Sequence, residues 1–186
     1  MLWLKKSSGL SINISDMSKK AVFIVAQANF RDEELLEPKK VLASRGIITK
    51  IAARTRHKAV GKLGTEINPD LAIREIEPKD FDAIIFVGGA GAREYFSDQE
   101  VFSLVNNFRL AGKILAAICI APSILANAGA LISKTVTAFA GEEENLRNKG
   151  ADYTGMDIEV DGKIVTASGP SAAREFGEKI AYLLEE

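Results

Sequence analysis

Three stretches of the chain contain continuous apolar runs, and they limit the folds that the chain can adopt. AVFIVAQ (21–27), the strand part of FDAIIFVGGAG (81–91) and KILAAIC (113–119) show no alternation of apolar and polar residues. A strand with one face in water alternates, whereas a continuous apolar run is typical of a strand buried on both faces. Because helical patterns separate these runs, the sequence predicts a mostly parallel sheet covered by helices on both sides, a three-layer α/β/α sandwich.

The segments between the three runs carry the signals of helices and hairpins. Leu35, Pro38, Val41 and Leu42 share one face of a predicted helix that Gly46 ends. Further predicted elements are a strand at 46–54, a hairpin or irregular connection at 60–73, a helix at 97–112 that begins with a Ser97/Glu100 capping box, a strand at 135–139, a charged helix at 142–150, a hairpin at 157–168 around Asp161-Gly162, and an amphipathic helix at 171–186.

Length and composition predict one compact domain and exclude several classes of protein. Of the 186 residues 47% are hydrophobic, enough for a substantial core, and we expect a single domain at 19–186. The first residues, 1–18, show no steady apolar period and no clear signal peptide, so we expect an N-terminal extension or a misassigned start. A formal net charge of −1 with interleaved charges argues against a nucleic-acid partner, and no apolar run is long enough to cross a membrane.

The chain has one cysteine, Cys119, and one histidine, His57. A single cysteine cannot form an intramolecular disulfide and rules out a thiolate zinc site. We therefore expect no metal, no cofactor, and a reducing, cytoplasmic location.

Chemically useful residues follow three of the predicted strands. They are the loop after Gln27, the Gly88-Gly89 pair and Cys119. Ligands of parallel α/β sheets bind at the carboxyl ends of the strands, so these features are expected to meet.

Cys119 has the spacing of a nucleophile elbow, in which a tight strand-to-helix turn exposes a reactive side chain. Such a turn needs small neighbours, here Ala117 and Ala121, and Pro122 is well suited to the first turn of the following helix. A helix N-terminus would favour the reactive thiolate. The N–H groups of Gly89 and Ile120 could then form an oxyanion hole, with Gly88 in a supporting role. From these residues alone, a buried core thiol is an equally good interpretation of Cys119, and a plain tight turn is the favoured interpretation of Gly88-Gly89.

Three segments resemble the ThiJ/PfpI superfamily: FVGGAGAREYF, AAICIAPSILANAGAL and DGKIVTASGPSAAREF. The resemblance covers residues 19–186 and implies a flavodoxin-like fold shared with class I glutamine amidotransferases. It also implies a homodimer or a larger homo-oligomer, and a glutamate four positions before a proline that lies against the cysteine sulfur. Here that residue is Glu34, before Pro38.

A carboxyl beside a thiolate must keep a proton, because two adjacent negative charges repel. By this resemblance a protonated Glu34 would donate to the Cys119 thiolate and act as general acid/base. We expect the neighbouring acids Asp32, Glu33 and Glu37 to be solvated residues at the start of the helix.

The chain departs from the family pattern at positions that limit its chemistry. The protease-like branch has histidine directly after the cysteine, where this chain has Ile120, and an acid where it has Arg31. The glyoxalase/deglycase branch has a histidine at the position that matches Ala138. His57 matches neither histidine, so we expect it to lie at the surface.

Four functions remain open. The first is glyoxalase- or deglycase-type activity on small reactive carbonyl compounds such as methylglyoxal, through Cys119 and Glu34. The second is a redox or stress-response protein whose cysteine meets an oxidant. An intracellular cysteine protease is disfavoured because no histidine adjoins the cysteine. A binding domain with a vestigial pocket is the fourth.

Overall fold

A computed structural model describes residues 18–186, so the predicted extension at 1–18 lies outside the described residues except for Ser18. Within this range seven strands form one sheet in the order β11-β12-β8-β7-β1-β3-β6, parallel except for the β11–β12 hairpin. These strands are β1 (Lys20–Ile24), β3 (Ile48–Ala53), β6 (Leu71–Ala72), β7 (Ala83–Phe86), β8 (Ile114–Ile118), β11 (Ile158–Asp161) and β12 (Ile164–Ala167). The predicted mostly parallel sheet is confirmed.

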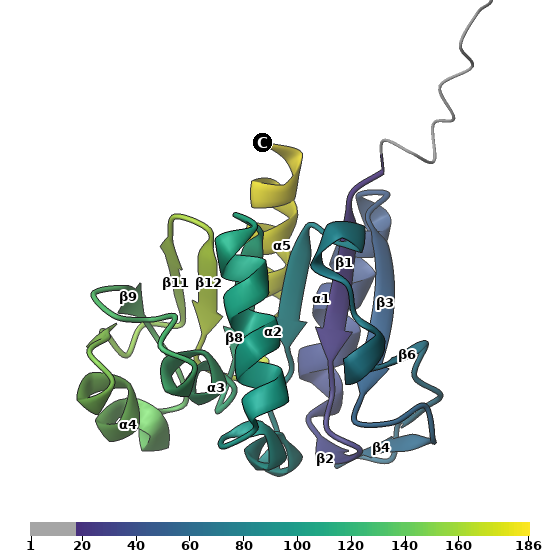
Figure 1. Ribbon diagram of the computed structural model, residues 1–186, viewed down its shortest axis with the longest axis horizontal. Coiled ribbons are helices and arrows are strands. Elements are labelled where there is room, and N and C mark those ends of the chain that lie inside the picture. Colours follow the sequence, from purple (N-terminus) through teal and green to yellow (C-terminus); the bar gives the residue numbers. More distant parts are fainter. Residues whose placement is uncertain (1–17) are drawn as a thin grey trace, which may run out of the picture.

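Five α-helices and two small sheets complete the described part of the chain (Figure 1). The helices are α1 (Asp32–Ser44), α2 (Gln99–Leu110), α3 (Pro122–Asn127), α4 (Glu143–Asn148) and α5 (Ala173–Glu185). One small sheet joins β2 (Ala28–Phe30), β4 (Ala59–Gly61) and β5 (Glu66–Ile67), and the other joins β9 (Thr135–Val136) and β10 (Asp152–Tyr153). Short 3₁₀ turns include η4 (Ala90–Tyr95) and η5 (Ala140–Glu142).

The sheet separates two hydrophobic cores, as the continuous apolar runs require. Alternate residues of β1 enter different cores: Val22 and Ile24 pack with α2 and α3, whereas Ala21 and Phe23 pack with α1 and α5. Figure 1 shows α2 on the near side of the sheet and α1 on the far side. The fold is therefore the three-layer sandwich that the sequence predicts.

The predicted apolar helix faces are buried, but one predicted cap is wrong. Val101, Leu104, Val105 and Phe108 of α2 all lie in the core. The N-cap of α2 is Asp98 rather than Ser97, and its carboxylate accepts hydrogen bonds from the N–H groups of Glu100 and Val101. Both residues are common N-caps, and sequence spacing does not choose between neighbours.

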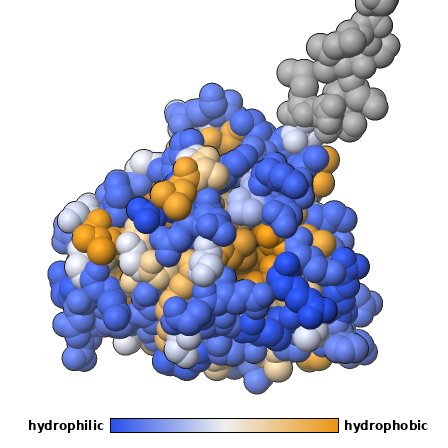
Figure 2. All heavy atoms as spheres, in the orientation of Figure 1, coloured by the Kyte–Doolittle hydropathy of each residue, from blue (hydrophilic) through white to orange (hydrophobic). Residues whose placement is uncertain are grey.

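The three central strands β1, β7 and β8 are adjacent and parallel, so their carboxyl ends lie at one edge of the sheet. Gln27, Gly88 and Cys119 follow these ends. In the described residues no helix combines the length and apolarity of a membrane span. Hydrophilic residues dominate the face in Figure 2, where apolar residues form separate patches.

Candidate active site

Cys119 forms a strained turn between β8 and α3. Its φ of 63° lies in the left-handed region, which residues with a Cβ rarely adopt. Two backbone hydrogen bonds hold the turn: the Cys119 N–H donates to the Ala167 carbonyl at 2.9 Å, and its carbonyl accepts from the Phe139 N–H at 2.8 Å. Ala117 and Ala121, on either side, are fully buried. The predicted nucleophile elbow is therefore present, with a half-buried thiol.

Glu34 lies in the first turn of α1 and reaches Gly88, which follows the end of β7. Its side chain is 0% exposed, and Oε2 accepts a hydrogen bond from the Gly88 N–H at 3.0 Å. The approach requires glycine, since a Cβ on residue 88 would lie 2.5 Å from Glu34 Oε2 and 2.7 Å from Cys119 Cβ. The absence of a side chain at Gly88 thus lets the Glu34 carboxyl lie close to Cys119.

The N–H groups of Gly89 and Ile120 lie near the sulfur. Gly89 has a φ of 92°, and a Cβ there would lie 2.5 Å from backbone atoms of Arg31 and Asn29. Hydrogen bonding by both N–H groups lowers the pKa of the Cys119 thiol. Two convergent backbone donors beside a nucleophile are the arrangement of an oxyanion hole.

Burial governs the protonation of the pair formed by Cys119 and Glu34. Burial raises the pKa of Glu34 from 4.5 to about 7, although interactions with Cys119, Gly88 and Arg31 lower it. Burial first, and then the neighbouring Glu34 carboxylate, raise the pKa of the Cys119 thiol from 9.0 to about 12. Burial and Glu34 therefore outweigh the Ile120 N–H group at the start of the helix, which lowers the pKa of the thiol as expected. Near neutral pH the thiol keeps its proton while Glu34 is partly ionised, so Glu34 is suited to accept the thiol proton.

Glu34 also carries a polar atom without a partner. Among the described residues Oε1 is buried and makes no hydrogen bond, whereas Oε2 is bonded to Gly88. Buried polar atoms are rarely left without a partner, and exceptions occur at reactive sites. The free oxygen leaves Glu34 able to take or give a proton.

Asp32 contradicts the prediction that it is solvated. It is 3% exposed, and its two carboxylate oxygens accept from the N–H groups of Leu63 and Thr65 at 2.8 and 2.9 Å. Burial favours a higher pKa for Asp32, but hydrogen bonds from Thr65 and Leu63 outweigh burial and lower it. Both oxygens of Asp32 are therefore bound to the loop beside α1.

The positions that depart from the family pattern hold no second base for Cys119. His57 is exposed and lines a polar hollow with Arg54 and Arg74. Ile120 and Ala138 are buried. Arg31 precedes α1, and its guanidinium forms a two-point ion pair with Glu33.

A buried carboxylate close to the elbow, Glu142, is absent from the residues that the sequence singles out. It accepts from Ser123 Oγ at 2.6 Å and from Arg93 Nη2 at 3.0 Å. Glu142 opens an acidic run, which is the pattern of a solvated helix start, so no sequence signal distinguishes it.

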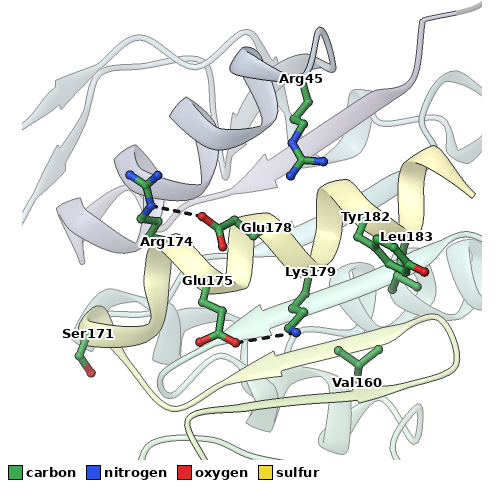
Figure 3. Close-up of a pocket in the computed structure, with 9 residues that line it drawn as sticks. All are labelled: Arg45, Val160, Ser171, Arg174, Glu175, Glu178, Lys179, Tyr182 and Leu183. Carbon is green, nitrogen blue, oxygen red and sulfur yellow. Dashed lines mark hydrogen bonds and ion pairs between the residues drawn. The ribbon is translucent and has the colours of Figure 1, made fainter.

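Other parts of the described chain offer no competing centre of this kind. In residues 18–186 no group of three or more His, Cys, Asp or Glu side chains could hold a metal ion. A groove of about 750 Å³ runs along α5 and is bordered by Arg45 and Val160 (Figure 3). Surface ion pairs such as Arg174–Glu178 line it, and neither Cys119 nor Glu34 reaches it.

Comparison with known proteins agrees with this fold and identifies a family. A sequence model of the DJ-1/PfpI family matches residues 19–183. An uncharacterized protein of Methanocaldococcus jannaschii is 36% identical over 90% of this chain and 83% of its own. A protein of Pyrococcus abyssi named a deglycase is 31% identical over 88% of this chain and 99% of its own. The crystal structure of a ThiJ/PfpI domain protein from Brachyspira murdochii superposes with a TM-score of 0.88 at 33% identity, covering 90% of this chain and 97% of that one.

Replacing Glu34 by glutamine is expected to weaken the pH dependence of stability. A carboxyl whose pKa rises from 4.5 to about 7 on folding binds more protons in the folded state, so its stabilising contribution is full below pH 4.5 and is lost as pH rises through about 7. Between pH 4.5 and 8 the change in the free energy of unfolding should be smaller in Glu34→Gln than in the wild type by about 3 kcal/mol. Urea unfolding measures it, with Glu37→Gln as the control, and an unchanged pH dependence would contradict the buried carboxyl.

Gly88→Ala is expected to disrupt the site, because the added Cβ overlaps Glu34 and Cys119. We expect a loss of about 2 kcal/mol in the free energy of unfolding. Gly169→Ala is the matched control, since a Cβ at residue 169 meets nothing within 4 Å. Equal stability of the two variants in urea unfolding would show that the close approach at Gly88 is unimportant.

Proposed function

The chain belongs to the DJ-1/PfpI family, and we propose that within this family it is a cysteine-dependent enzyme of glyoxalase or deglycase type that acts on small reactive carbonyl compounds such as methylglyoxal. The observation that supports this most is the fully buried carboxyl of Glu34 beside the elbow Cys119. Relatives named deglycases, at about 30% identity, favour the same class of reaction.

The reaction begins with attack of the Cys119 sulfur on the aldehyde carbon. The thiol proton passes to Glu34, whose pKa near 7 suits a base at neutral pH. The carbonyl oxygen gains negative charge and is held by the N–H groups of Gly89 and Ile120. Protonation of this oxygen gives a hemithioacetal.

A proton shift then converts the hemithioacetal to a thioester. Glu34, once more ionised, removes the proton from the former aldehyde carbon, and the neighbouring ketone oxygen becomes a hydroxyl through an enediol. Reprotonation at the second carbon leaves a lactoyl thioester on Cys119. Water hydrolyses this ester to lactate and restores the thiol, so methylglyoxal and water are the only reactants consumed. The step requires one group that both accepts and donates protons, which is the role of Glu34.

Oxidation chemistry is the second candidate, and the unpartnered Glu34 Oε1 favours it. Two equivalents of peroxide would convert the half-buried thiol to a sulfinate with release of two waters. A protonated Oε1 could then donate to a sulfinate oxygen. Peptide hydrolysis gains no such support, because the residue after the cysteine is a buried isoleucine.

Lactate formation from methylglyoxal tests the first proposal. Cys119→Ala and Glu34→Gln should each lower kcat/KM by at least about 100-fold, since one removes the nucleophile and the other the proton carrier. His57→Gln should keep the wild-type rate, because His57 lies in a different hollow. Activity that survives both site substitutions would refute the proposal.

Intact-mass measurement after mild peroxide treatment tests the second. The wild type should gain two oxygen atoms and stop there, and Cys119→Ala should gain none at this position. In Glu34→Ala, which removes the stabilising donor, the sulfinate should give way to further oxidation. A wild type that gains no oxygen would exclude this function.

A further inference from the structure

A hydrogen-bonded network centred on Glu142 lies next to the elbow. Glu142 is 5% exposed and bridges two segments: Ser123 Oγ in the first turn of α3 donates to Oε2 at 2.6 Å, and Arg93 Nη2 in η4 donates to Oε1 at 3.0 Å. Asn145 Nδ2 donates to Ser123 Oγ at 3.0 Å. We call these four residues the Glu142 network.

Each segment that Glu142 holds begins at one of the two N–H donors near the sulfur. Ser123 follows Ile120 by one turn, since the Ser123 N–H donates to the Ile120 carbonyl at 3.2 Å. In η4, Gly89 is the N-cap, and its carbonyl accepts from the Ala92 N–H at 3.0 Å, one residue before Arg93. The Glu142 carboxylate therefore links the turn that carries the Ile120 N–H to the 3₁₀ turn that carries the Gly89 N–H.

The backbone of Glu142 is tied to the cysteine itself. The Glu142 N–H donates to the Phe139 carbonyl at 2.9 Å, and the Phe139 N–H donates to the Cys119 carbonyl at 2.8 Å. The bonds thus form a closed path from Cys119 through Phe139 and Glu142 to Ser123 and back to the elbow.

We propose that Glu142 is a positioning residue, which holds the Gly89 and Ile120 N–H groups at the spacing needed to bind negative charge at the sulfur and at the carbonyl oxygen of the substrate. The effect of Glu142 on turnover rests on the function proposed above, whereas its effect on the Cys119 thiolate does not. Burial of a carboxylate costs free energy unless its oxygens accept hydrogen bonds. The bonds from Ser123 and Arg93 are therefore needed, and each restrains the segment that donates it.

The network is separate from the other charged groups near the sulfur. Those groups are Glu34 and Arg31, which lie at the start of α1 and make no hydrogen bond to Arg93, Ser123 or Glu142 in the described part of the chain. Substitutions in the network therefore leave these two charges in place.

The test uses Glu142→Gln and Arg93→Gln, with Glu143→Gln as the matched control. Glu143 adjoins Glu142 but pairs only with Arg147 at the surface. Arg93→Gln keeps the proposal testable if Glu142→Gln fails to fold, because the Arg93 side chain is 62% exposed. Since Cys119 is the only cysteine, its alkylation by iodoacetamide measures the thiolate without background.

Both network variants should slow alkylation at pH 8.5 by about three- to tenfold, because displaced N–H groups stabilise the thiolate less. A simple charge effect predicts opposite signs, since loss of the Glu142 charge would speed alkylation and loss of the Arg93 charge would slow it. With methylglyoxal, kcat should fall about tenfold while KM changes less than about twofold. The double variant should be no worse than the worse single one, because both break the same ion pair.

Opposite shifts in the two variants, or unchanged alkylation in both, would overturn the proposal. So would an equal effect in Glu143→Gln. If the wild type does not turn over methylglyoxal, the proposed function fails, and the alkylation rates still decide whether Glu142 positions the two donors.

Discussion

The contact of the Glu34 carboxyl with Gly88 and Cys119 is the interaction on which the site depends. It requires a glycine at the end of β7, because any Cβ there would overlap both side chains. It also requires that the start of α1 be fixed against the sheet, which buried Leu35 and the Arg31–Gly88 backbone hydrogen bond accomplish. The two cores on either side of the sheet hold β7 and β8 in register. Their packing offsets the free-energy cost of keeping the Glu34 carboxyl buried at the strand ends.

Two opposing effects, the N-terminus of α3 and burial, decide the protonation state of the Cys119 thiol. A helix N-terminus stabilises a nearby negative charge by about 0.3 to 1 kcal/mol, which corresponds to less than one pKa unit. Burial beside a carboxyl acts in the opposite direction and raises the pKa of Cys119 from 9.0 to about 12. In the proposed reaction the elbow therefore supplies geometry, and Glu34 supplies the activating proton transfer. This division explains how a nucleophile can work without a neighbouring histidine.

The central strands were predictable because few structures besides a strand buried on both faces produce short apolar runs between helical patterns. Parallel strands bring their carboxyl ends together, so Gly88 and Cys119 could be placed at one edge from sequence alone. Glu34 could be chosen among four acids of α1 only through the family resemblance, since Asp32 is also buried and holds a different loop. Glu142 was beyond reach for a similar reason: a run of three glutamates does not reveal that only the first faces inward, because that depends on partners far apart in the sequence.

Cys119 contacts both hydrophobic cores, since it lies where the chain leaves the sheet between them. A change of packing on the α1–α5 side and one on the α2–α3 side thus converge on a single sulfur atom. The reactivity of this thiol consequently reports on the packing of both cores. A substitution in either core that alters the packing against Cys119 therefore alters the surroundings of the same thiol.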